Sequence, residues 1–327
     1  MTRTPEPIGV VGLGRVGSHA ARQLRTGTAP LRVYDIDRAR RTAVLAALRP
    51  GDGVAEPNGG PGTTVVVATP AGNHAEFAAP LIRSGVSVIS TSDDPADVQD
   101  LLTLDELAKS NEVTVVVGAG LSPGFSCLLA AHAARRFLEV QELSVWTTGT
   151  AGPACARRHH RSLQQPGLAR IDNRWVEKRG GSGRDLAWFP GALGARDCYR
   201  GALAEPVLLH RQFPKAERIS ARTSANRRDR ITSRLPMLRA PHDDGGPGGF
   251  RLEVRGITSN GYHTEVVGIM AFPSVASGTV AAVAANWVHH SDSPAGVVGV
   301  AELGAPAQFL TELHHRGLTA ARFLGIS

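Results

Sequence analysis

The densest group of reactive side chains in the sequence lies in the stretch GTAGPACARRHHRSL, residues 149–163. One cysteine, two adjacent histidines and three arginines fall between Cys155 and Arg161. Side chains of these types could bind a metal ion, supply a thiolate nucleophile, or hold an anion and move a proton. Their spacing along a helix helps to choose among these three kinds of chemistry.

Pro153 is well placed to begin a helix that runs to Leu163, because proline is favoured at the first helical position. In that helix Cys155 and His159 share a face, whereas His160 points about 100° away. A metal site would therefore lack a third ligand, and a thiol–imidazole pair would lack a third group to orient it. We expect no bound metal.

The helix is better suited to binding an anion and handling a proton, because arginine binds carboxylates bidentately and histidine titrates near neutral pH. We expect His159 or His160 to be the acid–base group, with Tyr199 as a further candidate. The side chains expected to hold a substrate carboxylate are Arg157, Arg158, Arg161 and Arg200. Both faces of one helix cannot enter one cleft, so only some of these residues can serve. The structural alternative is a solvated basic helix with Cys155 packed inside.

A glycine-rich turn near the start of the sequence indicates a dinucleotide-binding fold. The apolar strand at 8–11 leads directly into GLGRVG, residues 12–17, and a helical pattern follows. In this context Gly12 permits a tight turn, Gly14 lets the backbone approach a pyrophosphate, and Gly17 allows close helix–strand contact. The pyrophosphate would then face the positive end of the helix.

Asp35 follows the second expected strand, residues 31–34, and is placed to accept hydrogen bonds from an adenosine ribose. An acid at this position favours NAD over NADP, so NAD is the expected cofactor. Arg38 lies close behind and could meet a 2′-phosphate, which keeps NADP open. The structural interpretation of Arg38 is a solvated residue in the first turn of the next helix.

Strands and helices continue to alternate along the first half of the sequence. Further strands are expected at 64–68, 86–90 and 113–117, and helices at 38–48, 73–84, 95–109 and 125–138. This alternation predicts an α/β fold with a Rossmann-type doubly wound parallel sheet, whose ligands lie beyond the carboxyl ends of the strands. The expected cofactor-binding residues are Gly12, Gly14, Arg15, Val16, Gly17, Asp35, Arg38, Thr69, Pro70, Asn73, Ser92, Gly118, Gly120 and Pro123.

Two polar pairs in these loops have both functional and structural interpretations. Asn73 could lie at the cofactor or cap the following helix, and His74 could be a solvated first-turn residue. Asp93 could be an acid near the reaction centre. Alternatively, Asp93 and Asp94 could cap the helix that begins at Pro95, which is the commoner use of aspartate there.

The second half of the sequence predicts an α+β domain with a mixed or antiparallel sheet. Residues 142–148 alternate as a strand, and Asn260-Gly261 separates two alternating runs, which is a strong hairpin signal. The region from about 180 to 239 has no clear pattern, and 273–290 is typical of an Ala-rich helix. Because such sheets often pair across a two-fold axis, we expect a homodimer.

Composition limits the classes of function. The formal net charge is +7, and residues 151–240 hold 19 Lys and Arg against 7 Asp and Glu. Most of these basic residues are scattered arginines, which favours small carboxylates over nucleic acid as partners. No apolar run is long enough for a bilayer span or a secretory signal, and three distant cysteines do not suggest a disulfide framework. We therefore expect a cytoplasmic protein that binds neither nucleic acid nor membranes.

At GAGLSPG, residues 118–124, the pattern resembles a known family. This turn, GLGRVG, GVSVISTSDD and the tail VGVAELGAPAQFLTELHHRGL together resemble the saccharopine dehydrogenase-like NAD(P)-binding reductases, which include carboxynorspermidine synthases. The likeness is good over residues 8–150 and about 270–320. It implies a Rossmann domain at 1–125, a substrate and dimerisation domain at 126–272, and a C-terminal helical segment at 273–327 that packs back on the Rossmann domain.

The same resemblance implies hydride transfer between nicotinamide and an imine or secondary amine of an anionic, amino-acid-derived substrate. It assigns cofactor binding to the matched glycines and Asp35, but no catalytic residue, because the family has no short catalytic signature that matches the middle of this sequence. Two alternatives stay open. One is a semialdehyde or 2-oxo acid dehydrogenase that uses Cys155, and the other is a dinucleotide-binding sensor or scaffold without catalysis.

Overall fold

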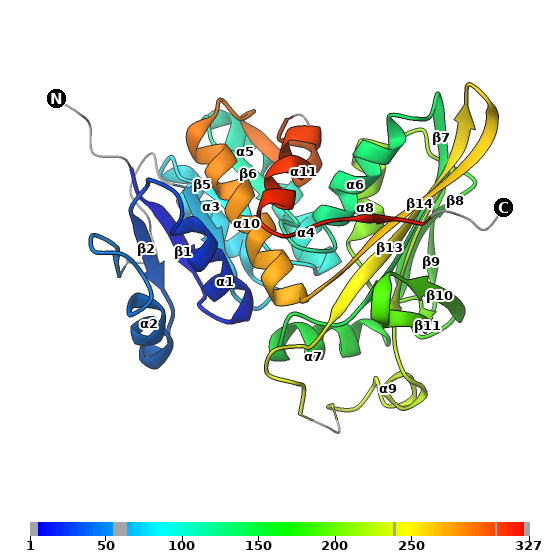
Figure 1. The fold of residues 1–327 in the computed structure, drawn as a ribbon, viewed down its shortest axis with the longest axis horizontal. Coiled ribbons are helices and arrows are strands. Elements are labelled where there is room, and N and C mark those ends of the chain that lie inside the picture. The colour runs from blue at the N-terminus through cyan, green and yellow to red at the C-terminus, as the bar shows by residue number, and fades with distance from the viewer. Residues whose placement is uncertain (1–5, 55–63, 238–239, 305, 324–327) are drawn as a thin grey trace. The chain divides into compact units, whose positions relative to one another are not determined.

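The structure, a computed structural model, describes residues 6–54, 64–237, 240–304 and 306–323. The chain folds as two compact units (Figure 1). The first contains Met1–Gly120 and Ser274–Ala305, and the second contains Leu121–Pro273 and Pro306–Ser327. Each unit is built around one β-sheet.

The first unit has a seven-stranded sheet in the order β15-β6-β5-β4-β1-β2-β3. Every neighbouring pair is parallel. This confirms the predicted doubly wound sheet, whose valine-rich strands are buried along their length as a parallel sheet covered on both faces requires. The strands are β1 (Ile8–Val11), β2 (Leu31–Tyr34), β3 (Gly53–Val54), β4 (Thr64–Val67), β5 (Ser87–Ser90), β6 (Thr114–Val117) and β15 (Gly296–Gly299).

The helices of the first unit largely follow the predicted pattern. They are α1 (Arg15–Leu24), α2 (Arg38–Leu45), α3 (His74–Arg83), α4 (Pro95–Leu102), α5 (Asp105–Ser110), α10 (Pro273–His290) and the 3₁₀ turn η2 (Val300–Glu302). The single helix expected at 95–109 was wrong, because it is interrupted between Leu102 and Asp105. There the Asp105 carboxylate accepts a 2.8 Å hydrogen bond from the backbone N–H of Val297 in β15, a tertiary contact that local periodicity does not show.

The backbones of α1 and α10 approach closely at Gly278. A Cβ at this position would lie 2.6 Å from the Cβ of His19 and 2.8 Å from both the backbone N of Ala20 and the backbone O of Val16. Two of these three atoms belong to the backbone of α1 and cannot move independently. The small residue therefore sets the packing distance between the two helices.

The second unit has a nine-stranded mixed sheet in the order β10-β11-β12-β7-β13-β14-β16, with β8 and β9 attached through β12. Among the described strands of this second sheet, only β7 and β12 pair in parallel. The predicted hairpin at Asn260-Gly261 is confirmed as β13–β14. The strands are β7 (Glu139–Thr148), β8 (Gly167–Ile171), β9 (Arg174–Lys178), β10 (Asp185–Phe189), β11 (Gly194–Tyr199), β12 (Arg218–Ser224), β13 (Gly248–Thr258), β14 (Gly261–Ala271) and β16 (Ala321–Arg322).

One face of this sheet is apolar and carries helices. Leu143 of β7, Ile219 of β12 and Phe250 of β13 are fully buried there. α6 packs on β7 and β13, with Phe125 edge-on to Phe250 at 5.8 Å between ring centres, and α8 packs on β12. The helices of this unit are α6 (Phe125–Ala134), α7 (Pro153–Ser162), α8 (Glu205–Gln212), α9 (Arg227–Ile231), α11 (Pro306–His315) and the 3₁₀ turn η1 (Gly191–Leu193).

The region around 180–239 is not irregular, as its sequence suggested, because β10, β11, α8, β12 and α9 all lie in it. Their patterns are short, and charged residues interrupt them. Arg222, for example, sits in the middle of β12 but faces Asp185 of β10, with 3.7 Å between the charged atoms. Such a residue breaks the apolar alternation without breaking the strand.

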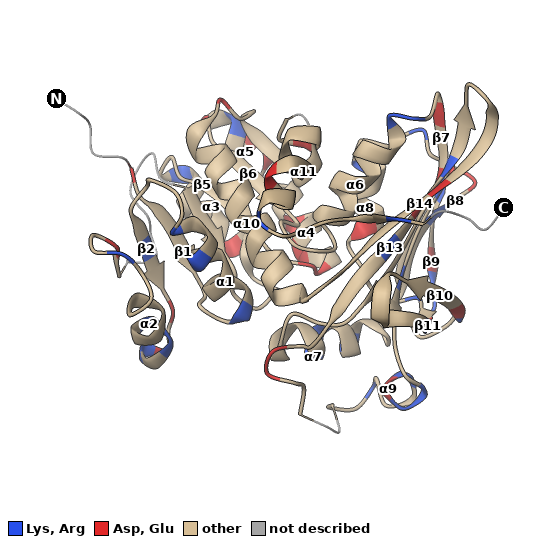
Figure 2. Cartoon of the chain, in the orientation of Figure 1, with Lys and Arg blue, Asp and Glu red and all other residues tan. Residues whose placement is uncertain are grey.

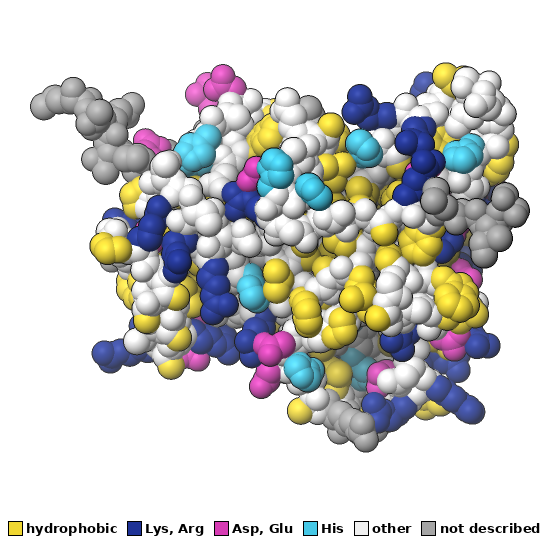
Figure 3. All heavy atoms as spheres, viewed as in Figure 1, with side chains coloured by type: hydrophobic (Ala, Val, Ile, Leu, Met, Phe, Trp, Pro, Cys, Tyr) yellow, Lys and Arg dark blue, Asp and Glu magenta, His cyan; other side chains and the backbone are white. Residues whose placement is uncertain are grey.

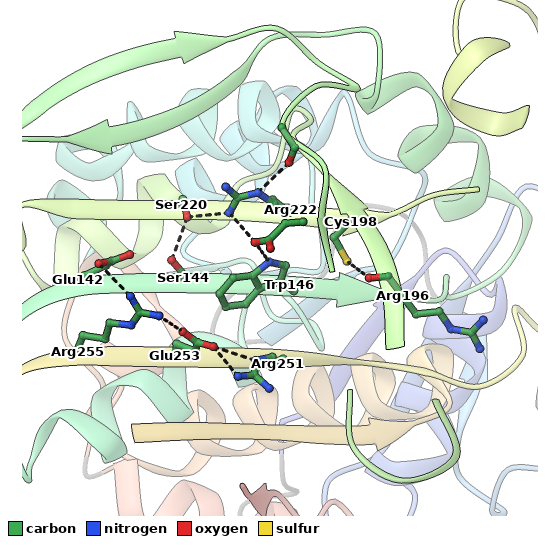
Figure 4. A network of polar contacts seen from close by, with 12 residues as sticks. Glu142, Ser144, Trp146, Arg196, Cys198, Ser220, Arg222, Arg251, Glu253 and Arg255 are labelled. Carbon is green, nitrogen blue, oxygen red and sulfur yellow. Dashed lines mark hydrogen bonds and ion pairs between the residues drawn. The ribbon is translucent and has the colours of Figure 1, made fainter. Parts of the chain in front are cut away.

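The opposite face of the same sheet carries paired charges (Figure 4). Glu253 lies between Arg251 and Arg255 at 2.5 and 2.7 Å, and Arg255 also reaches Glu142 at 3.7 Å. The indole N–H of Trp146 donates to Asp185 at 2.9 Å. These arginines have acidic partners within the sheet, so they contribute to its structure. Lys and Arg are otherwise spread over both units, and on the face in view they are dispersed among uncharged side chains (Figures 2 and 3).

The C-terminal region is divided between the two units, whereas the sequence suggested that all of 273–327 packs on the first. β15 pairs with β6 in the first unit. In the second unit α11 buries Phe309 and Leu313 and packs on α6, and β16 pairs with β14. None of the described helices is both long and apolar enough to cross a membrane.

Replacing Gly278 by alanine is expected to destabilise the protein. Alanine gains about 1 kcal/mol in helix propensity over glycine. Overpacking against fixed backbone costs about 1–3 kcal/mol, and we expect this steric cost to exceed the gain in propensity. Urea denaturation would show a lower midpoint for Gly278→Ala. Gly53→Ala is the control, because among the described residues its Cβ would meet only the end of the flexible Arg32 side chain, at 3.7 Å. Equal midpoints for the two variants would contradict this account.

Candidate functional site: a dinucleotide turn and a buried polar cluster

The glycine-rich turn of the first unit has the geometry that its sequence predicts. Gly12 has a φ of +87°, and a Cβ there would lie 2.7 Å from backbone atoms at Ala68 and Thr69. A Cβ at Gly17 would lie 1.8 Å from the carbonyl oxygen of Gly12. Both positions therefore require glycine for close backbone packing.

Gly14 differs from the other two glycines, because a Cβ on it would meet no described atom within 4 Å. Gly14 is the N-cap residue of α1, it makes no side-chain capping bond, and the first turn of α1 contains no acidic residue. The helix thus presents its N-terminal N–H groups and the positive end of its dipole to open space. This arrangement fits the pyrophosphate of a dinucleotide, which residues 12–17 would hold.

Asp35 is buried behind this turn and connects it to β2. Its Oδ2 accepts a 2.6 Å hydrogen bond from the Leu13 N–H, and its Oδ1 accepts a 2.8 Å bond from the Asp37 N–H. Each carboxylate oxygen retains capacity for a further donor such as a ribose hydroxyl. Arg38 is exposed. The guanidinium of Arg40, which the sequence did not single out, lies 4.0 Å from Oδ2 of this carboxylate.

The loop after β4 is organised by a buried histidine, which corrects the interpretation of His74 as a solvated residue. Its Nδ1 lies 2.8 Å from the Ser90 hydroxyl and its Nε2 lies 3.1 Å from that of Thr69. Asp97 accepts the backbone N–H groups of His74 and Gly72 at 2.8 and 3.0 Å. Burial lowers the pKa of His74, although the nearby charges of Asp97 and Asp93 act in the opposite direction. The imidazole therefore holds the loop in place as a neutral group.

The other expected cofactor residues lie in the first turn of α1 or in the loops at the carboxyl ends of the strands. Asn73 occupies the N-cap position of α3 but makes no side-chain capping bond, whereas Asp94 caps α4 by accepting the Ala96 N–H at 3.0 Å. Asp93, beside this cap, is half-buried. Arg15, Pro70 and Asn73 are exposed, Val16 and Thr69 are half-buried, and Ser92, Gly118, Gly120 and Pro123 are buried.

In the second unit, α7 divides its reactive side chains between two environments. Arg157 and Arg161 are exposed, whereas Arg158 and His160 are only 5% and 6% exposed. His159 is half-buried, and its Nδ1 lies 3.4 Å from the Thr223 hydroxyl of β12. The Cys155 sulfur lies within 4.8 Å of a ring nitrogen of His159, so these two residues share a helix face as predicted.

Tyr199 and Arg200 are adjacent in the chain but lie in different surroundings. Tyr199 is buried and pairs with Thr223 in the β11–β12 register, so its side chain lies on the same sheet face as the hydroxyl that meets His159. The guanidinium of Arg230 lies over its ring at 5.0 Å. The guanidinium of Arg200 lies against Gly183 instead.

Sequence reasoning missed Glu205, the first residue of α8, which is only 2% exposed. Its Oε1 accepts a 2.7 Å hydrogen bond from the Ser122 hydroxyl, and Ser122 lies 3.1 Å from the hydroxyl of Ser126. Burial raises the pKa of Glu205, while the Ser122 hydrogen bond and the charges of Arg158 and His159 act to lower it. In the sequence, Glu205 is a glutamate before a proline at the start of a helix, which is a common pattern for a surface residue. Only its burial in the folded structure distinguishes it from such a residue.

Comparisons with known proteins identify the fold. No family model and no curated protein matches the sequence. Saccharopine dehydrogenase (L-Glu forming) from Saccharomyces cerevisiae has a similar structure, with a TM-score of 0.68 and 12% identity over 98% of this chain and 100% of that one. Homospermidine synthase from Legionella pneumophila, in complex with NAD, is similar with a TM-score of 0.67 and 12% identity, over 97% of this chain and 91% of that one. DAP dehydrogenase from C. glutamicum, in complex with DAP, is similar with a TM-score of 0.53 and 14% identity, over 96% of this chain and 99% of that one. The fold is thus that of the Rossmann dehydrogenases that the sequence motifs resemble.

Gly14→Ala should weaken NADH binding about tenfold or more, or about 1.4 kcal/mol, without changing stability, because the added methyl group fills open space in front of α1. Gly17→Ala is the contrasting variant. Its methyl group collides with the backbone of Gly12, so it should lower the melting temperature. Calorimetric titration with NADH and thermal melts would measure the two effects. Undiminished binding by a folded Gly14→Ala variant would show that the pyrophosphate does not lie at this turn.

Proposed function

We propose that the protein is an NAD(P)-dependent oxidoreductase that acts on a C–N bond of an anionic, amino-acid-derived substrate. The observation that carries the proposal is the open N-terminus of α1 at Gly14, with the Asp35 carboxylate hydrogen-bonded to the same turn. The C–N chemistry is supported by the motif resemblance and by the similar structures, which include a saccharopine dehydrogenase and a homospermidine synthase.

When bound, the dinucleotide supplies or accepts the hydride. In the reductive direction the imine carbon gains the hydride, the C=N electron pair moves to nitrogen, and the nitrogen takes a proton from a side-chain acid. The imine is thereby reduced to an amine as the dinucleotide is oxidised. The protein must provide that proton and must hold the substrate carboxylates.

We assign the proton-handling role to His159. It is half-buried, so it is open to solvent on one side, and its ring is anchored at the Thr223 hydroxyl. His160 is buried and is less suited to exchange a proton with a bound substrate. Arg157 and Arg161 are exposed and stay the candidates for carboxylate binding. Arg158 is buried, so we assign it no contact with the substrate.

We propose NAD as the preferred dinucleotide, because the buried Asp35 carboxylate would accept ribose hydroxyls and would repel a 2′-phosphate. Arg40 lies close enough to offset part of that charge, so NADPH belongs in the same binding test. The homodimer expected from the sequence stays a prediction.

The function can be tested by incubating the protein with NADH or NADPH and pairs of 2-oxo acids and amines. Turnover would be measured as the loss of absorbance of the reduced nicotinamide. We expect turnover with at least one anionic pair. His159→Gln should lower kcat about a hundredfold, the contribution typical of one general acid–base group, while dinucleotide binding is retained. Failure of the protein to bind either dinucleotide would exclude the oxidoreductase proposal. Binding without turnover of any pair would favour a sensor or scaffold.

A thiol-dependent aldehyde or oxo acid dehydrogenase is the second candidate function. The specific observation in its favour is the Cys155 sulfur within 4.8 Å of a His159 ring nitrogen. Cys198 cannot take this role, because burial and the Asp185 charge raise the pKa of its thiol to about 12. Cys155→Ser separates the two functions. A thiol mechanism predicts loss of nearly all activity, whereas the C–N mechanism predicts little change.

A further inference from the structure

A glycine-rich loop of the second unit connects β9 to β10 and has the sequence RGGSGR, residues 179–184. Gly181 and Gly183 have φ angles of +66° and +62°, which residues with a side chain rarely adopt. A Cβ on Gly180 would lie 2.2 Å from the carbonyl oxygen of Gln165. Because these three positions carry no side chain, groups from other elements can lie directly on the loop backbone.

Three arginines from other parts of the second unit lie against this loop. A Cβ on Gly183 would be 2.5 Å from Cζ of Arg200, so that guanidinium rests on the backbone. A Cβ on Gly181 would be 3.3 Å from Cγ of Arg230. Arg222 of β12 donates from its Nε to the Gly183 carbonyl at 3.3 Å (Figure 4). Folding thus gathers three positive side chains around two glycines of one loop.

Among the residues that the structure describes, only one of these three guanidinium groups has an acidic partner. Asp185 lies 3.7 Å from Arg222, which has a side chain only 17% exposed. Arg230 lies over the ring of Tyr199, with 5.0 Å between the guanidinium carbon and the ring centre. Arg200 lies on the loop backbone. Arg222 therefore has a structural role, whereas the charges of the other two are not neutralised by an ion pair.

The other acidic side chains beside these elements are already engaged. Asp197 lies 3.0 Å from Arg184 at the end of the loop, and Asp229 lies 3.5 Å from Arg228 in α9. Burial lowers the pKa of Arg222, and the positive charge of Arg200 acts in the same direction. Like charges held close together repel each other, and a bound anion would relieve that repulsion.

We propose that Arg200 and Arg230 form an anion-binding site on the loop at Gly181–Gly183, which takes a carboxylate or phosphate group. Both side chains are half-buried, so each is partly held by its surroundings and partly open to solvent. A guanidinium offers several N–H donors in one plane, and this arrangement matches the oxygens of a carboxylate or phosphate. The site needs no dinucleotide, so it goes beyond the proposed function.

The test is thermal unfolding of the full chain in sodium chloride and, at equal ionic strength, in inorganic phosphate or in succinate. An anion that binds only the folded state raises the melting temperature as its concentration increases. We expect at least one of these two anions to raise it. In Arg200→Gln the dissociation constant derived from that rise should increase about tenfold or more, because a charged hydrogen-bond donor is lost.

Arg174→Gln is the matched control, because it removes one positive charge at the exposed start of β9, at the opposite end of that strand from the loop. This variant should keep the full rise. Arg230→Gln is the second test variant, in case Arg200→Gln does not fold, and it should lose affinity in the same way. Anion binding at the open N-terminus of α1 would raise the melting temperature of all variants equally.

Two results would overturn the proposal. One is the absence of any rise in the unmodified protein with either anion. The other is an equal rise in folded Arg200→Gln, Arg230→Gln and Arg174→Gln. A purely structural role of the two arginines predicts this second result, together with a lower melting temperature in chloride alone.

Where turnover is found, inhibition kinetics identify the source of the anion. Competition between the bound anion and the oxo acid would assign the site to a carboxylate of the substrate. Binding without such competition would assign it to a separate small anion. The melting experiments need neither substrate nor dinucleotide, so failure of the proposed function would leave their result unchanged.

Discussion

Backbone packing at one turn determines how the first unit is organised. The Cα of Gly17 lies so close to the carbonyl of Gly12 that no side chain fits between them, and a Cβ on Gly12 would lie 2.7 Å from the backbone of Ala68, directly after β4. Strand β1, helix α1 and strand β4 are therefore held against one another at a single point. Next to this packing, a Cβ on Gly14 at the start of α1 would meet no described atom within 4 Å. The Asp35 carboxylate, bonded to the Leu13 N–H, holds β2 to the same turn.

The second unit depends on a different constraint, which is the separation of charges between the two faces of one sheet. Arg251, Glu253 and Arg255 alternate with Phe250, Leu252 and Val254 along β13, so the charges lie on one face and the core lies on the other. The charged face is internally paired and stabilises the sheet. On the side that carries the helices, Glu205 accepts the Ser122 hydroxyl at 2.7 Å, and the His159 ring lies 3.4 Å from the Thr223 hydroxyl. Glu205 is buried, so that hydrogen bond offsets part of the cost of removing its carboxyl from water.

Much of this organisation could be predicted from local sequence. The parallel sheet, the dinucleotide turn, Asp35, the β13–β14 hairpin and the helix that begins at Pro153 all follow from periodicity, glycine spacing and turn residues, because those signals act over a few neighbouring residues. The same signals placed Cys155 and His159 on one face of α7. Charge composition also indicated an arginine-rich middle region, although it could not show that Arg222 and Asp185 pair across the sheet.

The tertiary structure decided what depends on contacts between distant residues. Sequence spacing could not show that Arg158 and His160 are buried while Arg157 and Arg161 are exposed, because burial on α7 depends on residues distant in the sequence. It gave no sign that His74 is enclosed by Ser90 and Asp97, or that the tail contributes β15 to one unit and α11 to the other. Glu205 is the clearest case. As a glutamate before a proline at a helix start it looks like a surface residue, and only folding brings it to the Ser122 hydroxyl and removes its water.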